Sequence, residues 1–238
     1  MVYKRVSKII FAAILAVTVF SGCGNRQEEG IDKTETETTT QKSTQDSTQD
    51  VTQEVEEETK YPSITSDGKM KDYKSVVTVD DTAYELYTYL DKVADNYAKS
   101  VNKVADTLAG KSDVYDLVIP LSSGITFPDN LKDKISSSDQ HDAMQKIQAK
   151  MDKHVKNVDV YDVLRQHRTE YEYFRTDHHW TTLGAYYAYT EFCKAKGITP
   201  ESLDAYSKKQ DFDGFLGSFY NDTSDAKLKA NPDTVTAY

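Results

Sequence analysis

The sequence predicts an α/β fold in which helices flank both faces of a parallel β-sheet. Two short runs rich in β-branched residues, 114–120 and 158–161, are separated by a helical pattern at 139–155. Strand, helix and strand at this spacing form a βαβ unit, whose two strands lie side by side and parallel with a right-handed crossover. Because ligands of such sheets bind at the carboxyl ends of the strands, we expect a functional site at that edge.

A long amphipathic helix is predicted before this unit. Apolar side chains recur at intervals of three and four between residues 82 and 109, which is the period of a helix with one apolar face. Thr82 and Glu85 have the spacing of a capping box, and Gly110 supplies a stop. The tyrosines of this apolar stripe are expected to pack, and no binding role follows from them.

Two helical segments are predicted after the unit. A helical turn is expected at 162–168. Thr181 or Thr182 caps a longer helix that runs to about Lys196. Cys193 lies within this helix and is expected to be a buried residue, not a nucleophile or a metal ligand.

Residues 1–22 are predicted to be a lipoprotein signal peptide. A basic start precedes an apolar run at 9–20, which is too short to span a bilayer comfortably as a mature helix. Small residues then precede Cys23, an arrangement that resembles the lipid-attachment site of bacterial lipoproteins. The sequence thus predicts an outward-facing protein anchored to the bacterial cell membrane through lipidated Cys23. The alternative is an ordinary signal peptide in which Cys23 has no role.

Residues 23–60 are predicted to be a disordered acidic tether. This stretch carries a net charge of −7, contains a repeat of the type Ser-Thr-Gln-Asp, and has almost no apolar side chain to bury. Residues 61–238 are predicted to form one domain. That domain is also acidic and has no basic run, which argues against nucleic acid as a partner.

The candidate site lies in the segment "EYFRTDHHWTTLGAYYAY", which contains the only Trp of the chain, Trp180. If the chain stays extended through Asp177, then Asp177 and His179 point to the same side. A carboxylate beside an imidazole fixes its tautomer and stabilises the imidazolium, which is the general-base half of a catalytic triad. Trp180 would form a wall of the site, and Arg175 and His178 are the other candidate pocket residues.

Two other interpretations of these residues remain open. The Asp-His pair can simply cap the following helix, with Trp180 in the core; this is the commoner outcome for an arbitrary Asp-x-His. Metal binding is the other, since Asp177, His178 and His179 are all ligand types. Adjacent side chains on an extended chain point apart, however, and no His-x-x-x-His or Cys pair supports them. No metal and no other cofactor is predicted.

The segment "YFRTDHHWTTLGAYYAY" resembles the signature of the DHHW family. These are secreted or lipid-anchored bacterial proteins with an SGNH-hydrolase-like (flavodoxin-like) fold, similar to the alginate O-acetylation proteins. Supporting likeness extends over four further segments: 118–131, 157–164, 211–221 and 231–238.

The resemblance implies roles for the candidate residues. Asp177 would be the triad acid and His179 the base, His178 would occupy the variable middle position, and Arg175 and Trp180 would shape the pocket. The implied chemistry is ester hydrolysis or acetyl transfer on carbohydrate hydroxyl groups, with envelope or cell-wall carbohydrate as the partner.

The nucleophile is missing from this pattern. In the similar acetylation proteins the nucleophilic Ser lies well downstream of the Asp-x-His-Trp motif, whereas this chain stops at Tyr238. We therefore expect a domain truncated at its carboxy-terminal end, with a sheet that lacks strands. Ser218, in a Gly-Ser-Phe context, and Ser122 or Ser123, after a strand, are the remaining candidates, and loop hydrogen bonding is the ordinary role for each.

Three functions therefore remain open from the sequence. The chain is part of an esterase or acetyltransferase that is inactive alone, or a non-catalytic surface lipoprotein that binds an envelope glycan, or a complete enzyme that uses one of these serines.

Overall fold

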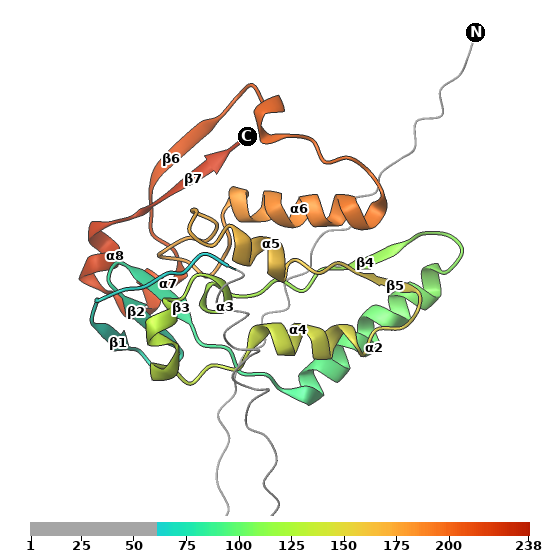
Figure 1. Cartoon of the computed structure of the whole chain (residues 1–238), viewed down its shortest axis with the longest axis horizontal. Helices are drawn as coiled ribbons and strands as arrows, with labels where there is room; N and C mark the ends of the chain where they lie inside the picture. Colours follow the sequence, from blue (N-terminus) through green and yellow to red (C-terminus); the bar gives the residue numbers. More distant parts are fainter. Residues whose placement is uncertain (1–60) are drawn as a thin grey trace, which may run out of the picture. The chain divides into compact units, whose positions relative to one another are not determined.

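The computed structural model describes residues 61–238, which form three small sheets and the helices around them (Figure 1). The predicted signal peptide, Cys23 and the tether lie outside the described residues. The elements, in chain order, are β1 (Met70–Asp72), β2 (Val76–Val79), β3 (Thr82–Glu85), α2 (Asp91–Leu108), β4 (Val114–Asp116), α3 (Ser122–Ile125), η1 (Asp129–Lys134), α4 (Gln140–Gln148), β5 (Val155–Asn157), α5 (Tyr161–Gln166), α6 (Thr182–Lys196), η2 (Leu203–Ala205), β6 (Gln210–Phe215), α7 (Ser218–Thr223), α8 (Ala226–Ala230) and β7 (Asp233–Ala237).

The predicted βαβ unit is present. Strands β4 and β5 pair in parallel, with Val114 opposite Val155, and α4 lies between them in the sequence. The Asp139 side chain caps α4 by accepting from a backbone N–H. The second strand was predicted three residues too late, at 158–161. Val158 still donates its N–H to the Asp116 carbonyl, but the chain turns there into α5.

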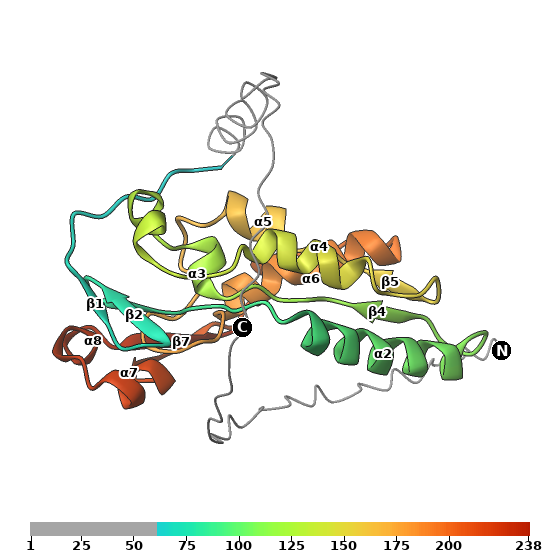
Figure 2. The same ribbon diagram turned by 90° about the horizontal axis from the view of Figure 1, so that it is seen from below.

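Helices lie on both sides of this parallel pair, as predicted. Figure 2 shows α2 on one side of β4, and α4 and α6 on the other. The Tyr115 ring of β4 packs edge-on against Phe192 of α6, with 5.1 Å between the ring centroids. Cys193 of the same helix is fully buried, as expected.

The helix predicted at 82–109 is shorter at its start, because residues 82–85 form β3. Strands β2 and β3 make an antiparallel hairpin in which Val77 lies opposite Tyr84. Its turn places Asp80 at a φ of 55°. Tyr84 is buried and packs edge-on against Phe127, 5.0 Å away. The capping box predicted for Thr82 and Glu85 is therefore wrong, since both residues belong to β3. An alternation of apolar and polar residues over only four positions cannot be distinguished from helical spacing.

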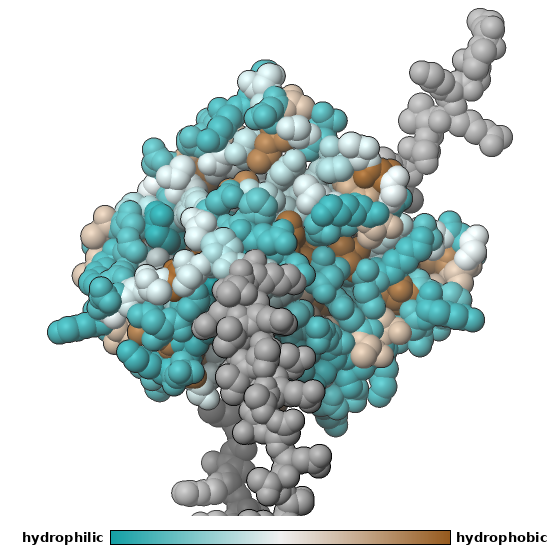
Figure 3. Space-filling model, in the orientation of Figure 1, coloured by the Kyte–Doolittle hydropathy of each residue, from teal (hydrophilic) through white to brown (hydrophobic). Residues whose placement is uncertain are grey.

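The buried face of α2 also differs from the predicted one. Its buried residues are three alanines, Ala94, Ala98 and Ala105. The predicted apolar stripe had Val93 or Ala94 at one position, and the structure buries Ala94; Val93, and Leu90 just before the helix, are more than half exposed. Within residues 61–238, no helix is long and apolar enough to cross a membrane. The face seen in Figure 3 is mostly hydrophilic, with hydrophobic residues in small patches, in keeping with the acidic composition.

Strands β6 and β7 pair antiparallel, although α7 and α8 lie between them in the chain. The sequence did not predict this pair, which is called the β6–β7 hairpin below. A bulge at Asp213/Phe215 interrupts their register, and Gly214 between them takes a φ of +85°. The hairpin bears on the site because the chain just after β6 and the first residue of β7 both form hydrogen bonds with it. The chain after β6 reaches Gly217 and Ser218, and β7 begins at Asp233; both ends contact the segment around Asp177.

Candidate active site

A tight loop carries the Asp-His-His motif. Its two ends meet where Tyr173 and Trp180 form an isolated antiparallel bridge. The Phe174 N–H donates to the His179 carbonyl at 3.2 Å, closing the loop between them. The expectation of an extended chain through Asp177 is therefore wrong beyond Tyr173.

The start of α6 follows directly and is as predicted. The Thr181 hydroxyl accepts from the N–H groups of Leu183 and Gly184, and the Thr181 N–H donates to the Glu172 carbonyl at 2.7 Å. An ideal Cβ on Gly184 would lie 2.5 Å from that same carbonyl oxygen. Only glycine allows the first turn of α6 to lie this close to the backbone of the motif, which fixes the base of the loop.

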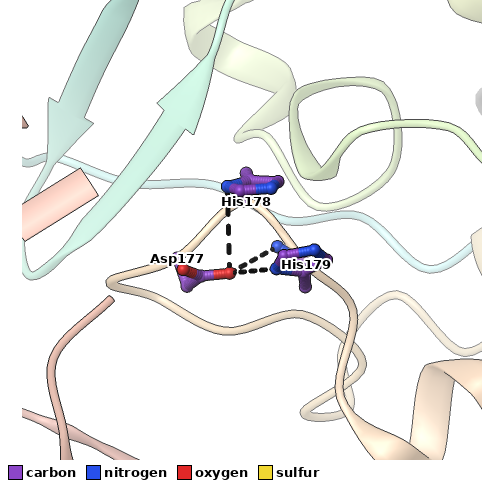
Figure 4. A group of neighbouring side chains, drawn as sticks. All are labelled: Asp177, His178 and His179. Atoms are coloured by element: carbon purple, nitrogen blue, oxygen red, sulfur yellow. Dashed lines mark hydrogen bonds and ion pairs between the residues drawn. The ribbon is translucent and has the colours of Figure 1, made fainter. Parts of the chain in front are cut away.

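Asp177 and His179 are in contact. Asp177 Oδ1 accepts from the His179 backbone N–H at 2.9 Å and lies 2.6 Å from His179 Nδ1 (Figure 4). The closeness was predicted, but its cause is a turn: a carboxylate that accepts from the N–H two residues on is a local feature of Asp in turns. The Asp177 side chain is 8% exposed, whereas that of His179 is 65% exposed.

The chain around Ser218 holds the other oxygen of the same carboxylate. The Ser218 N–H donates to Asp177 Oδ2 at 2.9 Å. An ideal Cβ on Gly217 would lie 2.3 Å from Asp177 Cβ, so this approach requires glycine at 217. Burial alone would raise the pKa of the Asp177 carboxyl, but the two backbone N–H groups and the His179 imidazole lower it below its ordinary value. Asp177 is thus a carboxylate at neutral pH.

Asp233, at the start of β7, fixes the residues just before Asp177. It is fully buried and accepts from the Arg175 N–H at 3.0 Å, the Thr176 N–H at 2.7 Å and the Thr176 hydroxyl at 2.6 Å, and also from the Tyr171 hydroxyl. Sequence reasoning did not find this residue. It lies in the segment 231–238 that resembles the family, which was the available signal.

Arg175 lies behind the loop. Its guanidinium donates to the Pro232 carbonyl at 3.1 Å and stands 5.0 Å from the centroid of the Tyr171 ring. Its hydrogen bonds are therefore made with the β7 end of the hairpin. Arg175 was predicted as a pocket residue; its contacts are those of a residue that supports the loop.

Ser218, one of the candidate nucleophiles, contacts the other imidazole. Its hydroxyl lies 2.8 Å from His178 Nδ1. Within residues 61–238, no hydroxyl group is hydrogen-bonded to the His179 imidazole. Ser122 is buried, and Ser123 accepts from the Gln140 side chain at 2.9 Å. Ser122 and Ser123 lie in α3, and Ser218 is the first residue of α7, so the loop position expected for these serines is wrong.

Trp180 packs against the main core cluster of the described residues. That cluster includes Tyr173, on the opposite side of the bridge, and Ala188 of α6. A cavity of about 360 Å³ elsewhere is lined by residues 87–90, the first half of α2, the chain after β4 and Ile147 of α4, and neither Asp177 nor His179 lines it. The contacts of Trp180 are those of a core residue, and the imidazole of His179 faces solvent directly.

Replacing Trp180 by Ala is expected to lower the free energy of unfolding by about 3 kcal/mol, because it removes a large side chain from the core. Replacing the exposed His179 by Ala is expected to change it by less than about 1 kcal/mol. Urea unfolding followed by circular dichroism measures both. Equal losses of stability in the two variants would contradict the different packing of these neighbours.

The motif also contains the residue types that hold metals. Asp177, His178 and His179 each offer one ligand atom, and these atoms lie within 4.8 Å of one another. Two kinds of chemistry are therefore available to the loop: proton transfer by the Asp-His pair, and coordination by all three residues.

Comparisons with known proteins agree on one family. A model of the family described as DHHW protein matches residues 24–238. A crystal structure of a DHHW family protein from Eubacterium siraeum is 32% identical, with a TM-score of 0.63; the match covers 74% of this chain and 57% of that one. These two findings confirm the family and the α/β fold class that the resemblance implied.

Two more distant structures are also similar. Bacillus cereus PatB1 is 16% identical, with 72% of this chain and 58% of that chain covered and a TM-score of 0.49. The O-acetyltransferase domain of Pseudomonas putida AlgJ is 16% identical, with 66% and 61% covered and a TM-score of 0.48. The chain thus spans less than two thirds of each of these structures. No curated protein matches it.

Proposed function

Because this chain belongs to the DHHW family, we propose that residues 61–238 are related to carbohydrate O-acetylesterases and O-acetyltransferases, with Asp177 and His179 as the acid–base pair. The observation that carries the proposal is the 2.6 Å contact between Asp177 Oδ1 and His179 Nδ1. An ionised carboxylate can only accept, so the imidazole donates through Nδ1–H. The lone pair of Nε2 is then free on a ring that is mostly exposed.

In this mechanism His179 acts as the general base. A hydroxyl group attacks the carbonyl carbon of an acetyl ester, and its proton passes to Nε2. Asp177 stabilises the imidazolium that forms. The proton then goes to the oxygen of the leaving alcohol as the ester bond breaks. Burial of Asp177 and its two backbone donors keep the carboxylate oriented throughout.

We infer that residues 61–238 do not supply the attacking hydroxyl. Because the Ser218 hydroxyl lies against His178 and not against His179, we propose that this chain by itself does not turn over acetyl esters through the pair. The purified chain is expected to hydrolyse p-nitrophenyl acetate at the rate given by its His179→Ala variant. A rate that falls at least about tenfold in that variant would mean that a complete site is present.

The acid–base pair itself is testable without turnover. In ¹⁵N NMR of the imidazole, the ring proton of neutral His179 is expected on Nδ1. In Asp177→Ala nothing holds it there, so the two tautomers are expected to interchange. His154, whose Nδ1 lies 2.8 Å from the exposed Asp106, serves as a control that the variant leaves unchanged. Identical tautomers for His179 in both proteins would exclude Asp177 as its partner.

We also propose that the chain is anchored at the outer face of a bacterial cell membrane through lipidated Cys23, with residues 23–60 as a spacer. The apolar run followed by small residues and Cys23 supports this, since lipidation on one residue with several acyl chains gives stable anchoring. In detergent phase separation the chain is expected in the detergent phase, and Cys23→Ser in the aqueous phase. Aqueous partition of both would contradict the anchor.

An alternative function is binding of an envelope glycan without catalysis. The observation that favours it is the open position of His178 and His179, which lie at the surface without a nucleophile beside His179. Polysaccharide pull-down distinguishes the two: retention on cell-wall glycan that is lost in His178→Ala and His179→Ala supports binding, and retention unaffected by either counts against this loop as the contact.

A further inference from the structure

The turn at Asp177 brings both imidazoles of the motif together. The rings of His178 and His179 lie 3.9 Å apart between centroids and are tilted by 35°. Figure 4 shows both rings beside the same carboxylate, with His178 and His179 joined by dashed lines to Asp177. Neighbouring side chains point apart on an extended chain, but the backbone turns at Asp177, so both imidazoles lie beside the same carboxylate.

One oxygen is the common point of this group. Asp177 Oδ1 lies 2.6 Å from His179 Nδ1 and 3.9 Å from His178 Nδ1. Ligands of tetrahedral Zn²⁺, at about 2.0–2.2 Å from the ion, lie roughly 3.3 Å from one another. Both distances to Oδ1 are within about 1 Å of that separation. The candidate ligand atoms lie at most 4.8 Å from one another. A small rotation of the two imidazole rings would therefore bring their nitrogens to the separation that a tetrahedral ion needs.

The parts of the group that must move are the exposed ones. The side chains of His178 and His179 are 43% and 65% exposed, so rotation of either ring disturbs little packing. Asp177 is the fixed member, held through both oxygens by backbone N–H groups of His179 and Ser218. A charged, prepositioned oxygen with two adjustable imidazoles is a donor set that suits zinc and other divalent transition metals.

We propose that Asp177, His178 and His179 bind one divalent transition-metal ion, such as Zn²⁺, at the surface of the loop. Water fills the remaining position. The Nδ1 contact of His179 with Asp177 and that of His178 with the Ser218 hydroxyl, 2.8 Å away, are both replaced by bonds to the ion.

The ion also changes what His179 can do, and this part rests on the proposed function. With the metal on Nδ1, the single ring proton of the neutral imidazole lies on Nε2. Nε2 then donates and can no longer accept a proton from an attacking hydroxyl. The bound ion is therefore an inhibitor of the acid–base pair and not a cofactor of it.

Calorimetric titration of the purified full chain with ZnCl₂ tests the site. One ion per chain is expected, and Asp177→Ala, His178→Ala and His179→Ala are each expected to weaken binding at least about tenfold. The matched control is His154→Ala, which breaks another His-Asp pair but removes no member of the group; its affinity is expected to be unchanged. Cys23→Ser is expected to bind like the original chain.

Two results would overturn the proposal: no saturable binding of Zn²⁺ up to millimolar concentration, or binding that survives removal of both imidazoles. The imidazole ¹⁵N spectrum separates the two parts. On addition of Zn²⁺ the ring proton of His179 is expected to move from Nδ1 to Nε2. If Zn²⁺ binds but the ring proton stays on Nδ1, the inhibitory role is wrong and the metal site is not. If the chain hydrolyses no ester, the metal site is not affected.

Discussion

Asp233→Ala is expected to lower the free energy of unfolding by about 3–5 kcal/mol, because removing one partner of a buried charged network leaves the others unsatisfied. The carboxylate is fully buried and accepts from two backbone N–H groups and two hydroxyls. All four donors belong to the stretch that leads into Asp177. Without Asp233, the Arg175 and Thr176 N–H groups have no acceptor, and the approach of the loop to β7 is lost.

Asp213→Ala is the matched control for this prediction. Asp213 lies on the same hairpin and accepts from the Thr234 hydroxyl at 2.7 Å, but it is exposed. Its loss is expected to cost less than about 0.5 kcal/mol. Urea unfolding by circular dichroism compares the variants, and the ¹⁵N spectrum of His179 reports whether the loop is altered. A small loss for Asp233→Ala would show that the hairpin does not hold the loop.

Stability is expected to fall as the pH rises from about 4.5 to about 8, and Glu172 is the residue responsible. Its side chain is fully buried and neither oxygen has a hydrogen-bond partner. Burial, assisted by the nearby charge of Glu170 and opposed by that of Arg168, raises the pKa of Glu172 from 4.5 to about 8. Below pH 4.5 the carboxyl is protonated in both the folded and the unfolded chain, so it contributes no penalty.

Above that pH the unfolded chain loses the proton while the folded chain must keep it, so folding becomes less favourable until the folded group also ionises. The loss amounts to at most about 5 kcal/mol above pH 8. Glu172→Gln keeps the shape of the neutral acid and cannot ionise. Its free energy of unfolding is expected to exceed that of the original chain increasingly between pH 5 and pH 8.

The control for Glu172 is the exposed Glu201. Denaturation at several pH values is expected to give Glu201→Gln the same pH profile as the original chain. If Glu172→Gln has that profile too, Glu172 does not stay protonated in the folded protein.

The elements that the sequence predicted well are those whose signals are local. Strand β4 and α4 follow from a β-branched run and a helical period, and α6 from its Thr181 cap, whereas the parallel partner β5 was expected but placed three residues too late. The contact between Asp177 and His179 was also predictable, because two residues apart in the chain they can meet in either an extended or a turned backbone. Only the second arrangement brings His178 to the same carboxylate.

What the sequence did not predict depends on partners far along the chain. Asp233 and Thr176 are 57 residues apart, and Ser218 and Asp177 are 41 apart. Most of β6 is exposed, so no apolar alternation marks it as a strand. On α2 a clear pattern was present, but it predicted the wrong face. The large apolar residues follow a helical period, whereas the structure buries the alanines beside them.

The hairpin of β6 and β7 has a consequence for the order of events in folding. The βαβ unit and the turn at Asp177 close over short sequence separations, whereas the Ser218 N–H reaches Asp177 Oδ2 from 41 residues away. The carboxylate is therefore held through both oxygens only after the chain beyond β6 has docked. A transient detachment of that chain would release Asp177 Oδ2 while β4 and β5 stay paired, and amide hydrogen exchange at Ser218 measures how often this happens.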